Sequence, residues 1–336
     1  MTTHPLGAPL VLDANAIARL SMRAAIDALH AALERAPFPP TPQRLHLDVV
    51  ATGATSVDGS DGAAEPAELL VMPAAADGWA GTKTVGLVPG NAARGLPRVT
   101  SSYTLLGPPG LVPVAVLDGA ALTGLRTAAV SGLATRLAAR PDARRVVIVG
   151  AGVQGHAHAH AMAAVLDDVQ VTIVGRERSS ADALVARLRS ELAMAGASGK
   201  VVAGTLADVR TADVVCLCTS SVAPVVGLTD LAPGVHVNAV GAYRPDRREL
   251  DSDAVAASVV LVETREAALA EKGDLLLAEH DGTWSRTSIR ADLHEAASGA
   301  VTVRRSDEDR TLFASVGHAY EDLVVARAAV EQQRTR

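Results

Sequence analysis

A glycine-rich hexapeptide constrains the fold of this 336-residue chain more than any other feature. The stretch 150–155 reads GAGVQG, follows a short apolar run and precedes an Ala-rich helical segment. In a GxGxxG loop the first glycine permits a tight turn, the second lets a pyrophosphate approach the backbone, and the third lets helix and strand pack closely. The first N–H groups of the helix bind phosphate. We therefore predict a dinucleotide site at Gly150, Gly152 and Gly155.

From residue 144 onward, short apolar runs alternate with helical segments. The runs are RRVVIV, VQVTIVG, KVVAG, DVVCLC, VHVNAV and SVVLVE. Strands that are apolar along their whole length are typical of parallel sheets covered by helices on both faces. We predict an α/β fold with a central Rossmann domain, a doubly wound parallel sheet, over residues 124–311.

The flanking sequence predicts a second α/β domain built from both chain ends. A helix with Asp13 as N-cap opens the chain and carries apolar residues at helical spacing as far as Leu33. Four apolar runs follow, separated by Gly, Pro and Asp, and they indicate a mostly β layer: 45–50, 68–72, 82–88 and 112–117. An Ala-rich helix over 123–139 joins the domains. A last helix over 311–333 is expected to return to the first domain, which gives this domain residues 1–123 and 312–336.

Composition and charge exclude several classes of partner. The net charge is −6 and aromatic residues make up only 2% of the chain, whereas nucleic-acid binding needs a basic face or stacking platforms. There is no apolar stretch of membrane-spanning length and no leader pattern, so we expect a cytoplasmic protein without a membrane partner. Cys216 and Cys218 lie on one strand-like run and are expected to be packing residues without a disulfide.

The sequence after the second Rossmann strand favours NADP(H) as cofactor, with NAD(H) as the alternative. An NAD-specific domain usually places an acidic residue there for the ribose hydroxyl. Here the stretch 175–179 reads GRERS, with Gly at the expected acidic position. Arg176, Arg178 and Ser179 can hold a 2′-phosphate, whereas Glu177 keeps NAD(H) open.

Several long motifs resemble one known family. They are LTGLRTAAVSGLATRLAAR (122–140), CTSSVAP (218–224), PGVHVNAVGAYRPDRREL (233–250) and TLFASVGHAYEDLVVA (311–326), together with the glycine loop. In this order they resemble the ornithine cyclodeaminase and mu-crystallin family over nearly the whole chain. The resemblance implies a homodimer whose substrate-binding and dimerisation domain, formed by both chain ends, accompanies a central Rossmann domain.

The resemblance also implies a substrate-binding and catalytic set of Arg44, Lys83 and Arg126. An arginine is suited to an α-carboxylate because its guanidinium offers two parallel donors. The ammonium of Lys83 would orient the substrate and donate a proton to an imine nitrogen as hydride reaches the carbon.

Further contacts to the cofactor are implied by the resemblance alone. The residues concerned are Thr127, Val153, Gln154, Thr219, Val237, Asn238, Ala239, Val240, Arg247 and Ser315.

One position of the substrate site departs from the family pattern. Cyclodeaminases of the family carry Asp where this chain has Tyr243, and that Asp would serve the distal amine of ornithine. A phenol, with a pKa of about 10, cannot replace a carboxylate as base or ion-pair partner. Asp246 and Glu249 are nearby acids, but both fall in a segment that can simply cap a helix. The sequence is closer to the mu-crystallin branch, whose members resemble ketimine reductases.

Three functions follow as hypotheses. The first is NAD(P)H-dependent reduction of a cyclic or acyclic α-imino acid, such as pyrroline- or piperideine-2-carboxylate, or the reverse amino-acid dehydrogenation. The second is ornithine or lysine cyclodeamination with recycled NAD, and the third is ligand binding without catalysis.

No metal is expected. On a helix, His156 and His160 share a face and His158 points away, and the sequence shows no third ligand near them.

Overall fold

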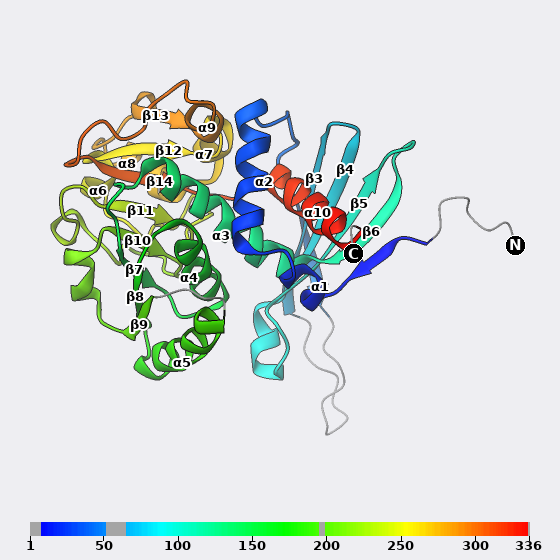
Figure 1. Ribbon diagram of the computed structural model, residues 1–336, viewed down its shortest axis with the longest axis horizontal. Coiled ribbons are helices and arrows are strands. Elements are labelled where there is room, and N and C mark those ends of the chain that lie inside the picture. The colour runs from blue at the N-terminus through cyan, green and yellow to red at the C-terminus, as the bar shows by residue number, and fades with distance from the viewer. Residues whose placement is uncertain (1–7, 52–64, 195–198, 335–336) are drawn as a thin grey trace, which may run out of the picture. The chain divides into compact units, whose positions relative to one another are not determined.

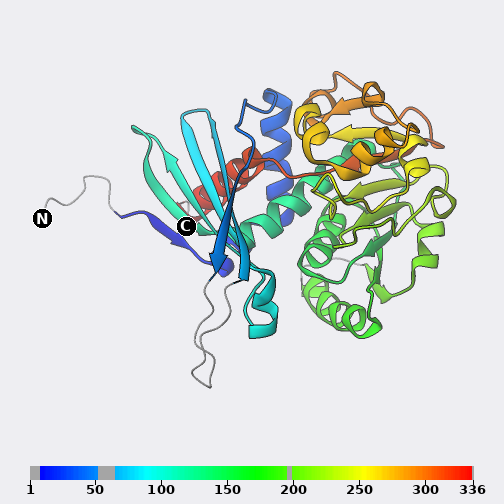
Figure 2. The same ribbon diagram turned by 180° about the vertical axis from the view of Figure 1, so that it is seen from behind.

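The computed structural model describes residues 8–51, 65–194 and 199–334. The chain divides into two compact units. The first consists of Met1–Ser21, Pro39–Thr123 and Ala319–Arg336, and the second of Met22–Phe38 and Gly124–His318. Each unit contains one sheet of its own (Figures 1 and 2).

The first unit is built on a six-stranded sheet in the order β1-β6-β5-β4-β3-β2. Neighbouring strands are antiparallel, except that β1 runs parallel to β6. The strands are β1 (Leu10–Leu12), β2 (Leu45–Ala51), β3 (Glu65–Ala76), β4 (Trp79–Leu87), β5 (Val99–Gly107) and β6 (Val112–Asp118). The turn from β3 to β4 is formed by Asp77 and Gly78, which both have positive φ, as a tight hairpin with right-handed strand twist requires.

Two helices and a 3-10 turn complete the first unit. The short α1 (Ala14–Ala18) is capped by Asp13, whose side chain accepts a hydrogen bond from the backbone N–H of Ala16, as predicted. A 3-10 turn, η1 (Pro89–Arg94), follows β4. The C-terminal α10 (Ala319–Arg334) packs against β3, β4 and β5. α10 therefore excludes water from the face of the sheet that it covers, and polar side chains on this face need hydrogen-bond partners within the protein.

The second unit contains an eight-stranded sheet whose paired strands are all parallel, in the order β13-β12-β14-β11-β10-β7-β8-β9. The strands are β7 (Arg145–Val149), β8 (Gln170–Val174), β9 (Lys200–Ala203), β10 (Val214–Leu217), β11 (His236–Ala239), β12 (Ser258–Val262), β13 (Ile289–Asp292) and β14 (Arg310–Ala314). The helices are α2 (Met22–Arg35), α3 (Gly119–Ala138, from Gly124 onward in this unit), α4 (Val153–Val165), α5 (Arg178–Met194), α6 (Ser252–Ala256), α7 (Arg265–Glu271), α8 (Gly273–His280) and α9 (Leu293–Ala297). This confirms the predicted Rossmann class.

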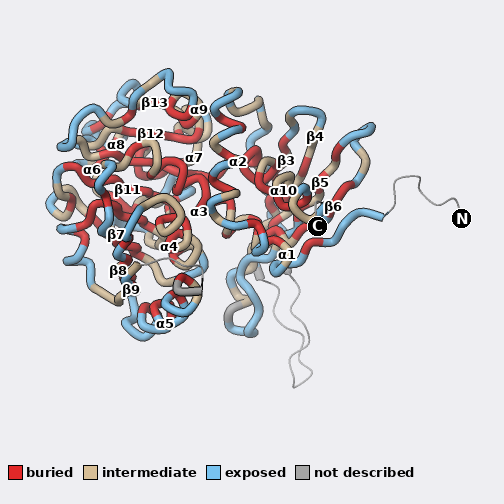
Figure 3. Tube along the Cα trace, in the orientation of Figure 1, coloured by how far each residue is buried: buried red, intermediate tan, exposed pale blue. Residues whose placement is uncertain are grey.

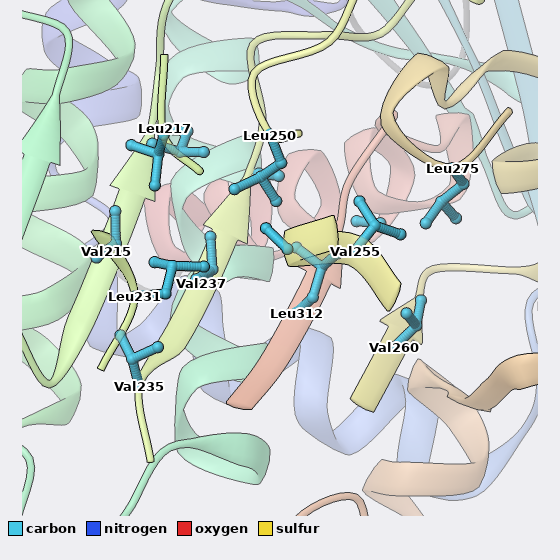
Figure 4. Close-up of a cluster of buried hydrophobic side chains, with 14 of the residues drawn as sticks. Val215, Leu217, Leu231, Val235, Val237, Leu250, Val255, Val260, Leu275 and Leu312 are labelled. Atoms are coloured by element: carbon cyan, nitrogen blue, oxygen red, sulfur yellow. The ribbon is translucent and has the colours of Figure 1, made fainter. Parts of the chain in front are cut away.

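Both faces of this sheet are buried, which explains why its strands are apolar along their whole length. Val215 and Leu217 on β10 point into the cluster of Figure 4, whereas Val214 and Cys216 point into a second cluster on the opposite face. Figure 3 shows the central strands as buried. Since side chains alternate between the faces of a strand, each position needs an apolar residue.

Three sequence-based boundaries differ from the structure. The single opening helix is two helices, because the chain turns at residues 19–21. The second of them, α2, belongs to the second unit, where it packs against α4 and α9. The helix predicted over 311–333 begins only at Ala319, because residues 310–314 form β14 between β11 and β12. A run with Thr, Leu and Phe suits a strand buried on both faces better than a helix.

Within the described residues, no helix combines the length and the apolar character needed to cross a membrane.

Asp213 links the amino ends of two central strands. Its carboxylate accepts hydrogen bonds from the backbone N–H groups of Arg144 and Arg145, at 3.1 and 2.9 Å, and from the guanidinium groups of Arg140 and Arg145. Burial opposes the charge, but the hydrogen bonds from Arg145 outweigh it and lower the pKa of Asp213 to about 2. The ionised carboxylate therefore stabilises the junction between β7 and β10.

Replacing Asp213 by Asn is expected to lower the free energy of unfolding at pH 7 by about 2 kcal/mol. Because the folded-state pKa lies below the unfolded one, the difference from the parent is full above about pH 4 and vanishes toward pH 2. Denaturant unfolding at several pH values measures this difference. Asp246→Asn is the control, since its ion pair with Arg244 is largely exposed and is worth less than about 1 kcal/mol. Equal losses for both variants would contradict the prediction.

Candidate dinucleotide and substrate sites

The glycine loop follows β7 and leads into α4, and its geometry requires two of its glycines. Gly150 has a φ of +124°, and a Cβ there would lie 2.4 Å from the carbonyl oxygen of Cys218. A Cβ on Gly155 would lie 1.9 Å from the carbonyl oxygen of Gly150. Gly152 has open space where its Cβ would project, at the N-cap of α4. The loop is thus tight where helix and strand meet and open where a phosphate would approach the helix terminus.

Two side chains, of Gln154 in this loop and of Arg247 in the segment after β11, have polar atoms that fit a ligand. Gln154 Oε1 and Arg247 Nε are buried and have no hydrogen-bond partner among the described residues. Buried polar atoms normally have a hydrogen-bond partner. Val153, at the start of α4, is 74% exposed although it is apolar. These three residues are among those that the family resemblance assigned to the cofactor, and their state fits a bound dinucleotide.

The end of β8 carries no acid next to the loop. The backbone N–H of Gly150 donates to the carbonyl oxygen of Val174, which brings the loop beside residues 175–179. Arg176, Arg178 and Ser179 are exposed, and Arg178 Nε lies 3.0 Å from Asp182 Oδ1 on the same helix. Both guanidinium groups and the first turn of α5 are therefore on the surface beside the glycine loop.

A buried Glu249 fixes the segments that follow β10 and β11. Its Oε1 accepts hydrogen bonds from the backbone N–H and hydroxyl of Thr219, at 2.8 and 2.7 Å, and its Oε2 accepts one from the N–H of Gly241 at 2.7 Å. Lys272 Nζ donates to the carbonyl oxygens of Ala239 and Ala242. Both carboxylate oxygens of Glu249 therefore bind backbone N–H groups, and Glu249 is not available as a catalytic base.

The predicted run along β11 lies in the core. Asn238 is fully buried, and its side chain bonds to Thr135 Oγ1 at 2.9 Å and faces His236 at 3.2 Å. Val237 belongs to the cluster of Figure 4, and Ala239 and Val240 are buried as well. Both faces of this parallel sheet are covered, so the side chains of Val237 and Asn238 pack inside the unit. Tyr243, beyond the strand, is 41% exposed.

A second buried carboxylate, on Glu263, orders the segment between β14 and α10. It accepts hydrogen bonds from the hydroxyl of Ser315 at 2.6 Å and from the backbone N–H groups of Val316 and Gly317. The Ser315 hydroxyl thus donates its hydrogen to Glu263 inside the unit. Sequence reasoning missed Glu263, since an acid at the end of a strand gives no signal of its distant partner.

Arg126, on α3, lies against this ordered segment. It is 5% exposed, beside the nearly buried Thr127 on α3. Gly317 has a φ of +80°, and a Cβ there would lie 2.5 Å from Arg126 Nη1. The guanidinium therefore packs closely against the backbone of this segment.

Lys83 lies in the first unit, under α10, and is 2% exposed. Its Nζ is 2.8 Å from Oδ2 and 3.0 Å from Oδ1 of Asp322 on α10, which is fully buried. Removing two charges from water costs free energy, so a buried ion pair contributes little to the stability of the fold. Such pairs are frequent at functional sites. Asp322 could not be identified from the sequence, because α10 and β4 are far apart in the chain.

Tyr103 lies beside this pair. It is opposite Lys83 in the antiparallel register of β4 and β5, is fully buried, and its hydroxyl has no hydrogen-bond partner among the described residues. Burial and the nearby charge of Asp322 raise the pKa of Tyr103 well above 10. Tyr103 therefore stays a neutral donor next to the ammonium.

Arg44 belongs to the same unit as Lys83. It directly precedes β2, whose Leu45 pairs with Val71 on β3. The next residue of β3, Met72, is the partner of Lys83 on β4. The structure thus places one of these two predicted cations at the start of β2 and the other on β4.

A third candidate metal ligand does lie near His156 and His160, contrary to what we expect from the sequence. Glu191 on α5 lies within hydrogen-bond distance of both His156 and His160 on α4. His158 points away, as expected, and bonds to Gln154 O and Ser131 Oγ. Glu191 could not be identified as a partner from the sequence, because α4 and α5 are separate segments of the chain.

Known proteins resemble this chain over most of its length. The model of the Ornithine cyclodeaminase/mu-crystallin family matches residues 55–336. A Delta(1)-pyrroline-2-carboxylate reductase from Bacillus cereus (strain ZK / E33L) is 36% identical over 266 residues, which is 78% of this chain and 81% of the relative. The ketimine reductase mu-crystallin of Mus musculus is 36% identical over 261 residues, 77% of this chain and 78% of the relative.

A solved structure shares the same architecture. It is the Thermococcus litoralis Delta(1)-pyrroline-2-carboxylate reductase in complex with NADH and L-proline, which is 28% identical. The match has a TM-score of 0.84 and covers 97% of this chain and 98% of the other. Together with the family model, these similarities show that the chain belongs to the ornithine cyclodeaminase/mu-crystallin family.

Proposed function

We propose that this chain is an NAD(P)H-dependent reductase of the C=N bond of a small α-imino acid. The observation that carries the proposal is the buried ion pair of Lys83 and Asp322, beside the neutral phenol of Tyr103. A protein that only stored or carried a ligand would not need a buried ammonium, because removing this charge from water costs free energy. Relatives named as pyrroline-2-carboxylate and ketimine reductases support the same reaction.

The side chains divide the reaction between them. Lys83 orients the imine and gives a proton to its nitrogen, while Asp322 keeps the ammonium charged and in place. Arg126 and Arg44 hold the carboxylate of the substrate, and Tyr243 lines the substrate pocket. When bound, the reduced nicotinamide supplies the hydride to the imine carbon. One hydride and one proton thus convert C=N to CH–NH.

A direct assay tests this reaction against cyclodeamination. Purified protein with pyrroline-2-carboxylate or piperideine-2-carboxylate is expected to oxidise one nicotinamide per amino acid formed, followed by its absorbance and by amino-acid analysis. A keto acid with an amine tests acyclic imines in parallel. Release of ammonia and proline from ornithine without net change in the nicotinamide would overturn the proposal. We expect no such release, because Tyr243 stands where cyclodeaminases carry Asp.

We also propose that NADP(H) is preferred over NAD(H). The supporting features are the absence of an acid at Gly175 and the exposed guanidinium groups of Arg176 and Arg178 beside the glycine loop. Arginine binds phosphate in two-pronged geometry. In the same assay kcat/KM is expected to be higher with NADPH, and a higher value with NADH would contradict this preference.

We further propose that the first unit forms the interface of a homodimer, and that the enzyme works in the cytoplasm, where thiols such as those of Cys216 and Cys218 stay reduced. β2 is the edge strand of its sheet, and its Leu45, Leu47 and Val50 are 53%, 45% and 69% exposed. An apolar exposed edge is typical of an association surface.

Sedimentation equilibrium is expected to give twice the chain mass of 34.4 kDa. Leu47→Lys places a charge on this edge and is expected to shift the protein toward the monomer. Leu206→Lys, at a leucine of the second unit that is 46% exposed, is the matched control and should stay dimeric. A monomeric parent, or equal dissociation by both variants, would contradict this assignment. Cell fractionation tests the compartment.

A further inference from the structure

Three side chains of the second unit converge outside the proposed reaction site. His156 and His160, one turn apart on α4, both direct Nε2 at Oε2 of Glu191 on α5, at 2.6 and 2.9 Å. We propose that these three residues bind one divalent transition-metal ion of the zinc type, with a fourth position left to water. The reaction proposed above neither uses this site nor depends on it.

The positions of the donor atoms suit such an ion. Residues four apart on a helix lie on one face, and the two imidazole rings have centroids 4.9 Å apart. The three ligand atoms all lie within 4.8 Å of one another. In a tetrahedral zinc site, with ligand bonds of about 2.0–2.2 Å, donor atoms are about 3.4 Å apart. Small side-chain rotations from the present hydrogen bonds therefore make room for the ion.

The surroundings orient the carboxylate as a metal ligand requires. Arg187 Nε donates to the other oxygen of Glu191, Oε1, at 2.7 Å, and so leaves Oε2 to the two imidazoles. Outer partners of this kind fix ligands in metal sites. The carboxylate is therefore held with Oε2 directed at the two imidazoles.

The donor set and its exposure indicate which ion fits. Two imidazole nitrogens and one carboxylate oxygen suit Zn²⁺, Co²⁺ or Ni²⁺, whereas Mg²⁺ and Ca²⁺ prefer oxygen ligands only. The three side chains are 22%, 26% and 28% exposed, so the ion can enter from solvent and keep a water ligand. A bound ion would join α4 to α5 and stabilise the folded second unit by mass action.

The test uses untagged, chelator-treated protein, Co²⁺ absorbance titration and Zn²⁺ equilibrium dialysis. One ion per chain, bound saturably, is expected. His160→Ala and Glu191→Gln should each weaken binding by more than about tenfold. Zn²⁺ should raise the unfolding temperature of the parent but not of these variants. His280→Ala, at an exposed histidine on α8, is the matched control and should bind like the parent.

Each variant has an internal check on its fold, because unfolding of the metal-free proteins is recorded in the same experiment. Reductase activity in the presence of chelator should be the same for the parent and for His160→Ala, which separates this site from the proposed function. Absence of saturable binding to the parent would overturn the proposal. Equal affinity of the parent and a folded His160→Ala variant would overturn it too.

Discussion

Replacement of Lys83 by Met is expected to lower kcat for imine reduction by about 10²–10⁴-fold, the usual contribution of a general acid. Methionine keeps the length of the side chain but has no proton to give to the imine nitrogen. Dinucleotide affinity, measured by nicotinamide fluorescence, should stay within about twofold of the parent, since Lys83 belongs to the first unit and the glycine loop to the second. The measurement is kcat and KM for the imino acid beside Kd for NADPH.

The control for Lys83 must separate lost chemistry from lost stability. The single variant leaves Asp322 buried beside an apolar side chain, which costs about 3–5 kcal/mol. Adding Asp322→Asn removes that charge as well, so the double variant should regain most of the stability and remain inactive. If the folded double variant reduced imines at the parental rate, Lys83 would not be the acid.

Much of the second unit could be predicted from local sequence. The order of strand and helix follows from apolar runs such as RRVVIV and DVVCLC, because a strand buried on both faces must be apolar at every position. The glycines at 150 and 155 were identified for reasons that the structure shows directly: a positive φ and a helix in contact with the strand. These features depend on neighbours in the chain.

The partners of the functional residues could not be predicted in this way. Asp322 lies 239 positions after Lys83, and Glu263 lies 52 positions before Ser315, so only the folded chain brings each pair together. Asn238 shows a related difficulty. The family resemblance alone implied a cofactor contact there, whereas the structure shows that its buried amide donates to the hydroxyl of Thr135. Polar residues in a Rossmann strand therefore need a partner search in the structure before they are assigned to a site.

Replacement of Arg126 by Ala is expected to lower kcat/KM for pyrroline-2-carboxylate by about 10²–10³-fold, mainly through KM, because removing one partner of a buried charge pair costs about 2–5 kcal/mol. Arg126→Lys should fall between the parent and Arg126→Ala, since an ammonium keeps the charge but cannot bind a carboxylate with two parallel donors. The decisive comparison uses 1-pyrroline, the same ring without its carboxylate.

The parent and Arg126→Ala should reduce 1-pyrroline at similar, low rates, because no group remains for the guanidinium to hold. The alternative is structural: Arg126 lies against Gly317, in the segment that Glu263 orders, and its loss could disturb that segment instead. A disturbed segment would slow both substrates alike. Equal losses with and without the carboxylate would thus show that Arg126 supports the backbone, whereas a loss confined to the imino acid shows that it binds the substrate.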